Sequence, residues 1–410
     1  MIPKVSKVVK SYIMSILKEY AFAKLNKSRK DFIVSVLWHI LSIKGKINFL
    51  QLERYSGLHE QTFRNQFEKK FDFFSFNKLL IDPIVSKERI VVLDPSYIPK
   101  SGKATYGRAK YWSGVAKTVK WGLDICGFAV VDIEKNTAFH LKAWQTPAPN
   151  ELLDKGLNLL SYYASLVIEN AAEFKEISTY MVADAYFSKK PFVDAVLCCG
   201  LNLISRLRND SVLMYKYKGE RTGNKGAPKK YTGKIDAKNI DLEYFTLDSS
   251  IDDMKIYSAV VYCKAFKRDV KLAIAVFYKE GKEVTRKLYF STNLNQLANE
   301  IVRYYRSRFQ IEFLYRDAKQ FAGLNTCQAR SQNKLDFHFN AVLTAVNLAK
   351  KVWVETKNNP KQPFSMCDYK TMYNNELMIN RFMSVFAINP NTTKNQKIVK
   401  ELLDYGKIAA

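Results

Sequence analysis

The sequence predicts an α/β fold: strands and helices in the order βββαβαβ, then a long helix. Three observations predict it. From Arg89 onward, short apolar runs alternate with stretches of helical periodicity; residues 209–293 are turn-rich and alternate apolar with polar positions; and residues 1–88 show only helical periodicity. With 410 residues, 47% of them hydrophobic, the chain is long enough for more than one hydrophobic core.

Residues 1–88 are expected to form a helical DNA-binding domain. A helix is predicted over 28–42, with a break at Gly45, and a short helix, a glycine turn and a second helix follow over 48–67. This pattern is typical of a helix-turn-helix, in which the start of the second helix faces base edges. The candidate base-reading residues are Gln61, Thr62, Arg64 and Asn65. An ordinary helical hairpin has the same pattern and remains an alternative.

Residues 89–208 supply the first part of the predicted α/β core. The apolar run Ile90–Leu93 ends at Asp94, and a second run, 179–183, ends at Asp184, as two buried strands would. Between and after them, the periodicity predicts strands over 121–133, 138–144 and 202–207 and helices over 151–174 and 189–199.

Residues 209–293 are expected to be a β-rich insertion domain. Two segments in it, 216–221 and 225–231, interleave cations with tyrosines, as a loop following a DNA backbone would, and a solvated basic hairpin is the alternative. The core would resume over 294–355 with a long helix from about Gln296 to Phe321, which Gly323 would terminate. A C-terminal helical region would occupy 356–410.

Charge and composition narrow the class of partner. The formal net charge of +26 indicates a polyanion, with nucleic acid favoured over a membrane surface because no run of 18 apolar residues occurs. The six cysteines lack C-x-x-C spacing, so we expect reduced, mostly buried thiols. No phosphate-binding glycine loop of the G-x-x-x-x-G-K-[ST] type occurs, and no nucleotide cofactor is expected.

Asp94, Asp184 and Glu312 are the candidate catalytic and metal-binding residues. If the two apolar strands are parallel neighbours, both aspartates emerge at one edge of the sheet, where sites form in α/β folds. Glu312, on the long helix, would be the third ligand, and three carboxylates suit Mg²⁺, with Mn²⁺ able to substitute. The alternatives are turn or cap roles for the aspartates and i±4 pairing of Glu312 with Arg308 and Arg316.

Four polar residues of the long helix follow the spacing Y-x2-R-x3-E-x6-K. Helical geometry places them on one face, together with the apolar Ile301 and Phe309, so that the charges interrupt a stripe directed toward a core. Charged groups in such a place need partners. The four are Tyr305, Arg308, Glu312 and Lys319.

With this spacing and the two strand-end aspartates, the chain resembles the cut-and-paste DDE transposases of bacterial insertion sequences, in the insertion-sequence-four family with its YREK signature. The resemblance covers roughly 89–348 and includes the segment Arg206–Asp210. It implies a ribonuclease H-like core in which the three acids hold metal ions. It also implies that the other signature residues, Tyr305, Arg308 and Lys319, contact DNA. To these we add the neighbouring cation Arg316 as a candidate DNA contact.

The resulting prediction is a cytoplasmic, nucleoid-associated bacterial transposase that cuts at the terminal inverted repeats of its element. As the resemblance implies, it would act as a homodimer on double-stranded transposon ends and target DNA, through a hairpin intermediate. One alternative is a catalytically inactive, transposase-derived DNA-binding protein or repressor. Another is a different ribonuclease H-like nuclease, such as a resolvase.

Overall fold

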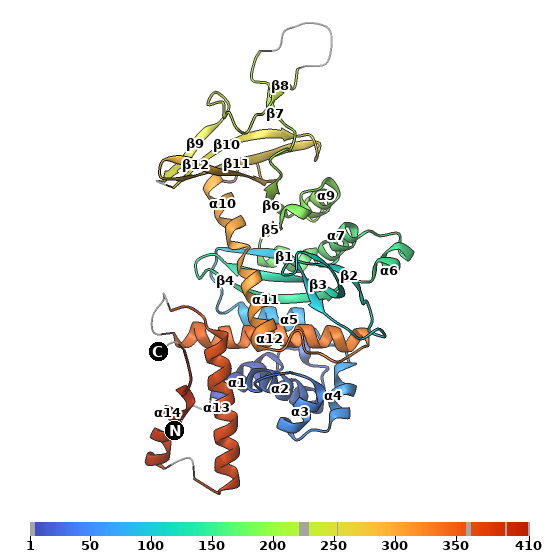
Figure 1. Ribbon diagram of the computed structural model, residues 1–410, viewed down its shortest axis with the longest axis vertical. Helices are drawn as coiled ribbons and strands as arrows, with labels where there is room; N and C mark the ends of the chain where they lie inside the picture. Colours follow the sequence, from blue (N-terminus) through green and yellow to red (C-terminus); the bar gives the residue numbers. More distant parts are fainter. Residues whose placement is uncertain (1–4, 221–228, 252, 358–361, 390–391, 409–410) are drawn as a thin grey trace.

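The computed structural model describes residues 5–220, 229–251, 253–357, 362–389 and 392–408 (Figure 1). Parts of the two basic segments at 216–221 and 225–231 lie outside these ranges. Along the longest axis in Figure 1, helices of the N- and C-terminal regions occupy one end, a sheet the middle, and a group of strands the other end. No helix in the described ranges is long and apolar enough to cross a membrane.

The N-terminal region is helical, as the periodicity predicts. Asn26 and Asn48 begin two of its helices by accepting a hydrogen bond from a backbone N–H in the first turn. Gly57 has a φ of 74°, a left-handed conformation that lets the chain turn between the two helices of the predicted helix-turn-helix. The helices are α1 (Val5–Ile16), α2 (Lys27–Ser42), α3 (Phe49–Ser56), α4 (Glu60–Phe67) and α5 (Phe73–Ile81).

The central strands form a mixed sheet whose order, β4-β3-β1-β5-β6, is consistent with a ribonuclease H-like domain. β1 pairs antiparallel with β3 and parallel with β5, and β5 pairs parallel with β6. The strands are β1 (Arg89–Pro99), β3 (Thr118–Asp132), β4 (Thr137–Gln145), β5 (Tyr180–Val182) and β6 (Asn202–Leu207). β1 and β5 are therefore the parallel neighbours that the prediction required.

The described residues between 209 and 293 contain six strands that continue the central sheet. β12 pairs antiparallel with β6, and the order then runs β12-β11-β10-β7-β8, with β9 beside β10. The strands are β7 (Leu213–Lys216), β8 (Tyr231–Lys234), β9 (Thr246–Ile251), β10 (Met254–Cys263), β11 (Arg268–Lys279) and β12 (Lys282–Ser291). In Figure 1 they lie at the end of the molecule opposite the N-terminal helices.

Between β4 and β6 one predicted helix is corrected, and before β3 one strand was missed. The single helix over 151–174 is three helices, because Gly156 adopts a φ of 66° and Asn158 starts a new helix with a capping box. They are α6 (Pro149–Asp154), α7 (Leu159–Glu169) and α8 (Ala171–Ile177). The predicted helix at 189–199 is α9 (Lys190–Cys198), and a strand that was not predicted, β2 (Ala109–Ser113), pairs with the first half of β3.

The long helix over 296–321 is also interrupted. α10 (Ala298–Ser307) and α11 (Gln310–Phe321) are separated at Arg308 and Phe309, where the backbone tightens into i,i+3 hydrogen bonds. Gly323 follows α11 with a φ of 83°, as predicted for a helix end. Phe309 is 48% exposed, so it does not continue the apolar stripe toward the core, whereas Ile301 is fully buried.

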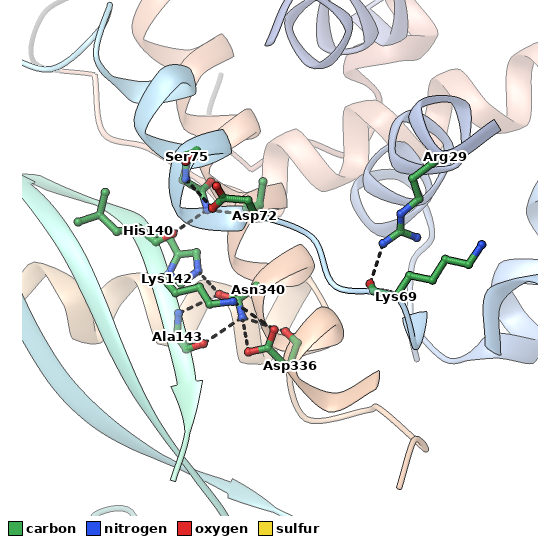
Figure 2. A network of polar contacts seen from close by, with 12 residues as sticks. Arg29, Lys69, Asp72, Ser75, His140, Lys142, Ala143, Asp336 and Asn340 are labelled. Atoms are coloured by element: carbon green, nitrogen blue, oxygen red, sulfur yellow. Dashed lines mark hydrogen bonds and ion pairs between the residues drawn. The ribbon is translucent and has the colours of Figure 1, made fainter. Parts of the chain in front are cut away.

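α12 (Gln332–Thr356) lies between the N-terminal helices and the sheet, and its polar side chains join the two layers (Figure 2). Asn340 accepts from the backbone N–H of Ala143 on β4 at 2.8 Å and donates to the carbonyl of the same residue at 3.0 Å. Lys142 on β4 pairs with Asp336 of α12 at 3.1 Å. These contacts fix the position of the sheet relative to the helical region.

The C-terminal region contains α13 (Met366–Val385) and α14 (Thr393–Asp404). All six cysteines are free, as expected, but only Cys126 and Cys263 are buried and Cys198 is exposed. The expectation of mostly buried thiols is therefore wrong, because four of the thiols lie at element ends or on partly solvated faces.

Candidate active site

Asp94 lies where β1 leaves its parallel neighbour. The parallel pairing of β1 with β5 ends at Val92 and Val182, two residues before each aspartate. The strand itself does not end at Asp94, contrary to the prediction, because β1 continues to Pro99 in antiparallel pairing with β3. At Asp94, β1 therefore still pairs with β3 but no longer pairs with β5.

Asp184 emerges from β5 at the same edge. Its side chain accepts a hydrogen bond from the N–H of Tyr186 at 2.9 Å and so caps the short 3₁₀ turn that follows. Its carbonyl accepts from the Ser205 hydroxyl at 2.8 Å, which ties the loop to β6. The cap role that was the alternative for this aspartate is therefore present, and it coexists with a position next to Asp94.

Arg308 joins two of the three candidate acids. Its Nη1 donates to Asp94 Oδ1 at 3.0 Å and its Nη2 donates to Glu312 Oε1 at 3.0 Å. The Arg308 and Asp94 side chains are 13% and 17% exposed, whereas that of Glu312 is 41% exposed. The i,i+4 pairing of Glu312 with Arg308 that was an alternative is therefore observed, and Arg308 also reaches across to the sheet.

The carboxylates of the site share one electrostatic environment. Burial raises the pKa of Asp94 to about 7, Arg308 opposes this rise, and the charges of Asp184, Glu312 and Asp124 add to it. Burial likewise raises the pKa of Asp184, against which a backbone N–H and Arg308 act. Burial, more than the neighbouring carboxylates, therefore favours the protonated forms of Asp94 and Asp184.

Lys319 and Tyr305 lie on either side of this cluster. Lys319 Nζ donates to Ser96 Oγ at 2.9 Å and to the carbonyl of Tyr97 at 3.0 Å, both on β1. The Tyr305 ring lies 4.9 Å from the ring of Tyr289 on β12 and 5.9 Å from the Arg308 guanidinium. Three residues of the signature spacing thus contact the sheet, whereas Glu312 contacts Arg308, and an interruption separates the helix of Tyr305 from that of Glu312 and Lys319.

Two further residues near Asp94 were not among the predicted site residues. Asp124 on β3 is 7% exposed and accepts hydrogen bonds from Thr146 Oγ1 at 2.5 Å and Tyr163 OH at 2.8 Å. Tyr315 donates from its hydroxyl to the Asp94 carbonyl at 2.6 Å. A lone carboxylate within an apolar strand was the available sequence signal for Asp124, whereas the tyrosine had none.

The remaining candidate DNA-binding residues lie away from the acids. Arg316 is half exposed, with its guanidinium 4.7 Å from the Phe313 ring and 3.2 Å from Asp317, so it does not pair with Glu312. The α4 residues have no contact with the acids: Gln61 donates to Asn65 at 2.8 Å, and Arg64 pairs with Glu60. Thr62 is partly exposed on the same helix.

The site meets the chemical requirement for a hard divalent cation but not the geometric one. Carboxylate oxygens suit such an ion, and the charges of Asp184, Glu312 and Asp124 act on Asp94. Within the described ranges, however, no group of three or more His, Cys, Asp or Glu side chains is arranged to hold a metal ion. The guanidinium of Arg308 lies between Asp94 and Glu312.

Comparison with known proteins gives one match. Residues 168–348 match the family model described as the transposase DDE domain, a range that includes Asp184, Arg308, Glu312 and Lys319 and begins after Asp94. No curated protein matches the chain. The DDE-domain match, on a mixed sheet consistent with a ribonuclease H-like domain, supports the assignment of this chain as a DDE transposase.

Proposed function

We propose that this chain is a cut-and-paste DNA transposase of the insertion-sequence-four family. It would bind the terminal inverted repeats of its element as a homodimer, cut there with divalent metal, and join the freed ends to target DNA through a hairpin intermediate. The observation that carries the proposal is the grouping of Asp94, Asp184 and Glu312 around Arg308 at the parallel edge of β1 and β5.

The three acids are the proposed metal ligands, with Mg²⁺ as the ion and Mn²⁺ as a substitute. When bound, such ions activate an attacking oxygen and stabilise the leaving one in phosphodiester chemistry. The acids supply oxygen ligands at an edge where burial disfavours uncompensated negative charge. Because Arg308 donates to two of them, ion binding requires its guanidinium to move off at least one carboxylate.

Arg308 and Lys319, with Tyr305 and Arg316, are the proposed contacts to the transposon end. Arginine and lysine are the usual phosphate donors, and a tyrosine hydroxyl adds a neutral one. In the free protein, Arg308 donates to the Asp94 carboxylate and Lys319 donates to the carbonyl of Tyr97. A phosphate that draws Arg308 away from Asp94 and Glu312 would at the same time free those carboxylates for metal, which couples end binding to assembly of the site.

The Arg308 bridge also favours a second candidate function. A protein in which the guanidinium remains between the acids would bind transposon ends without cutting them. This is the transposase-derived DNA-binding protein or repressor, and it would retain the fold and the positive charge.

The test is nicking of linear DNA that carries the inverted repeats flanking the gene. We expect Glu312→Gln, which keeps the side-chain size and a hydrogen-bond acceptor for Arg308, to bind these ends but to lose Mg²⁺-dependent nicking by at least about 100-fold, because a metal ligand is lost. Glu300→Gln, on α10, is the matched control and should nick as the unsubstituted protein does.

Retained nicking by Glu312→Gln in a nuclease-free preparation would contradict the assignment of that residue. End binding by the unsubstituted protein without nicking, in either Mg²⁺ or Mn²⁺, would establish the second candidate function instead. Cleavage without hairpin products would support a nuclease activity but contradict the hairpin intermediate.

A further inference from the structure

A positively charged groove lies between the N-terminal helices and the catalytic strand, away from the acids. It has a volume of about 910 Å³ and is bounded by α4 and the loop before α3, by the segment after β1, and by the chain from the end of α11 to the first turn of α12. Its cationic lining residues come from all three sides: Lys46, Arg64, Lys100, Arg330 and Lys334. None of the residues lining the described groove is an aspartate or glutamate.

The cations differ in whether a carboxylate already neutralises them. Arg64 pairs with Glu60, and Lys334 lies 3.2 Å from Glu68. Lys46, Lys100 and Arg330 have no ion pair with any residue that the structure describes. Three uncompensated positive charges therefore remain in one groove, a repulsive arrangement that an anion would relieve.

Lys100 is fixed in this groove by the backbone. Its Nζ donates to the carbonyls of Cys327 and Ala329, at 2.5 and 3.0 Å, and burial together with the nearby charge of Arg330 lowers its pKa. Holding an ammonium group beside a guanidinium costs free energy in the free protein. The two carbonyls thus keep a positive charge in place where no acid neutralises it.

A buried hydroxyl also faces the groove without a partner. Thr105 is 6% exposed, it lines the groove, and its Oγ1 has no hydrogen-bond partner among the described residues. Gly102 lies against it, and a Cβ at that glycine would come within 3.2 Å of the same oxygen. An unpaired buried hydroxyl is uncommon, and an acceptor from outside the chain would satisfy it.

We propose that this groove binds the sugar–phosphate backbone of duplex DNA between α4 and the active site. This inference rests on the proposed function, and it assigns to the groove a role that the signature residues do not fill. Lys100 directly follows β1, which carries Asp94, while Arg64 belongs to the second helix of the predicted helix-turn-helix. A backbone held here would connect the base-reading helix with the strand that carries chemistry.

The charge of the groove favours DNA over a small anion. Successive phosphates of one strand lie several ångströms apart, and cations from three separate segments suit a repeating polyanion better than a single phosphate ion. The net charge of +26 supports the same partner.

The experiment compares two double variants in duplex DNA binding over a series of salt concentrations. Lys46→Ala with Arg330→Ala removes two exposed cations of the groove, and Lys24→Ala with Lys155→Ala removes two exposed cations that do not line it. We expect the groove variant to reduce the slope of log K against log salt by about 1.8, since each phosphate contact contributes about 0.9 for B-form DNA. The control should leave the slope unchanged.

A single-residue variant tests the hydroxyl without altering charge. Thr105→Val keeps the shape and removes the unpartnered donor, so folding should be unaffected while the Kd for duplex DNA rises about fivefold at an unchanged salt slope. Ethylation interference gives a third measurement: the groove double variant should lose interference at specific phosphates that the control retains.

An unchanged salt slope and an unchanged interference pattern in the groove variant would overturn the proposal. Binding of inorganic phosphate in the groove, with DNA binding unaltered, would overturn it in favour of a small-anion site. The salt-slope and affinity measurements use any duplex and ethylation interference uses DNA that carries the inverted repeats, and none of these measurements requires cleavage. If the unsubstituted protein does not nick DNA at the inverted repeats but the groove variant still lowers the salt slope, the proposed function is rejected and the groove proposal stands.

Discussion

At the scale of single residues, the backbone at Asp94 depends on a contact that no side chain larger than hydrogen allows. Gly127 on β3 lies opposite Asp94 in the antiparallel register. A Cβ at Gly127 would come within 2.1 Å of the Tyr315 hydroxyl, which donates to the Asp94 carbonyl. The glycine therefore leaves the space through which α11 reaches β1.

This contact gives a prediction about stability. Gly127→Ala should lower the free energy of unfolding by about 1–3 kcal/mol, because the tyrosine must be displaced from a packed position. Tyr315→Phe removes the hydroxyl, so the double variant should be less destabilised than the sum of the single variants. Urea unfolding in a double-mutant cycle measures this coupling.

Gly233→Ala is the control, since nothing lies within 4 Å of a Cβ there. Additive effects of the Gly127 and Tyr315 substitutions, within about 0.5 kcal/mol, would contradict the proposed steric conflict.

At the scale of elements, α12 connects the N-terminal helices with the sheet through buried amide groups (Figure 2). Asn340 is fully buried and satisfies both backbone groups of Ala143, and it lies 3.1 Å from the His140 ring. Burial lowers the pKa of His140 to about 3, so the ring stays neutral in this contact. An apolar residue at this position would leave several buried groups unpaired.

Asn340→Leu should therefore lower the free energy of unfolding by about 3 kcal/mol or more, since each unpaired buried polar group costs about 1–3 kcal/mol. Gln332→Leu, at the exposed start of the same helix, should change it by less than about 0.5 kcal/mol. Thermal and urea unfolding of both variants measure the difference. Equal effects at the two positions would show that the amide contacts do not hold the elements together.

The packing of α13 on α2 gives a pH dependence. Lys370 is 3% exposed and donates to the Ile40 carbonyl; burial chiefly, and then the charge of Lys44, lowers its pKa from 10.5 to about 7. Between these two values the unfolded chain binds more protons than the folded one. The contribution of this group to the free energy of unfolding therefore rises with pH, by about 2 kcal/mol between pH 7 and pH 9.

Lys370→Met should remove this dependence, so the free energy of unfolding of the unsubstituted protein minus that of the variant should rise by about 2 kcal/mol from pH 7 to pH 9. Lys397→Met, on exposed α14, serves as the control and should show no such trend. A constant difference across the pH range would mean that Lys370 titrates normally in the folded protein.

At the scale of the whole molecule, one sheet runs through the chain. The sheet extends from β2 to β8 by way of β6 and β12, and α10 and α11 pass from the distal strands to the parallel edge (Figure 1). Tyr305 thus contacts β12 through Tyr289, while Arg308 on the same path contacts β1. A displacement of the distal strands would therefore reach the acids through a short helical connection.

We expect the net charge of +26 to make DNA affinity steeply dependent on salt. For a protein that contacts 6–10 phosphates, raising the salt concentration from 50 to 200 mM should weaken duplex binding by about 10³–10⁵-fold, because bound counterions are released on association. Fluorescence anisotropy at several salt concentrations measures this. A loss of less than tenfold would contradict an extended phosphate interface.

The sequence by itself determined most of the order of the central elements, although it missed β2. Apolar runs of strand length, the caps at Asn26 and Asn48, and the glycine at position 323 act locally, so periodicity and turn chemistry are sufficient to predict them. The apolar runs before Asp94 and Asp184 gave the positions of the two strands, but β1 continues past Asp94, and the parallel pairing of β1 with β5 was a condition of the prediction that the structure meets.

Only the tertiary structure decided how the charges are paired. The bridge from Arg308 to Asp94, the fit of Tyr315 against Gly127, and the groove that joins Arg64 with Lys100 all connect residues far apart in the chain. The interruption between α10 and α11 changes only two residues, too few to alter a helical period. Sequence patterns report the local preferences of the backbone, whereas the partner of a buried charge is fixed by packing between distant segments.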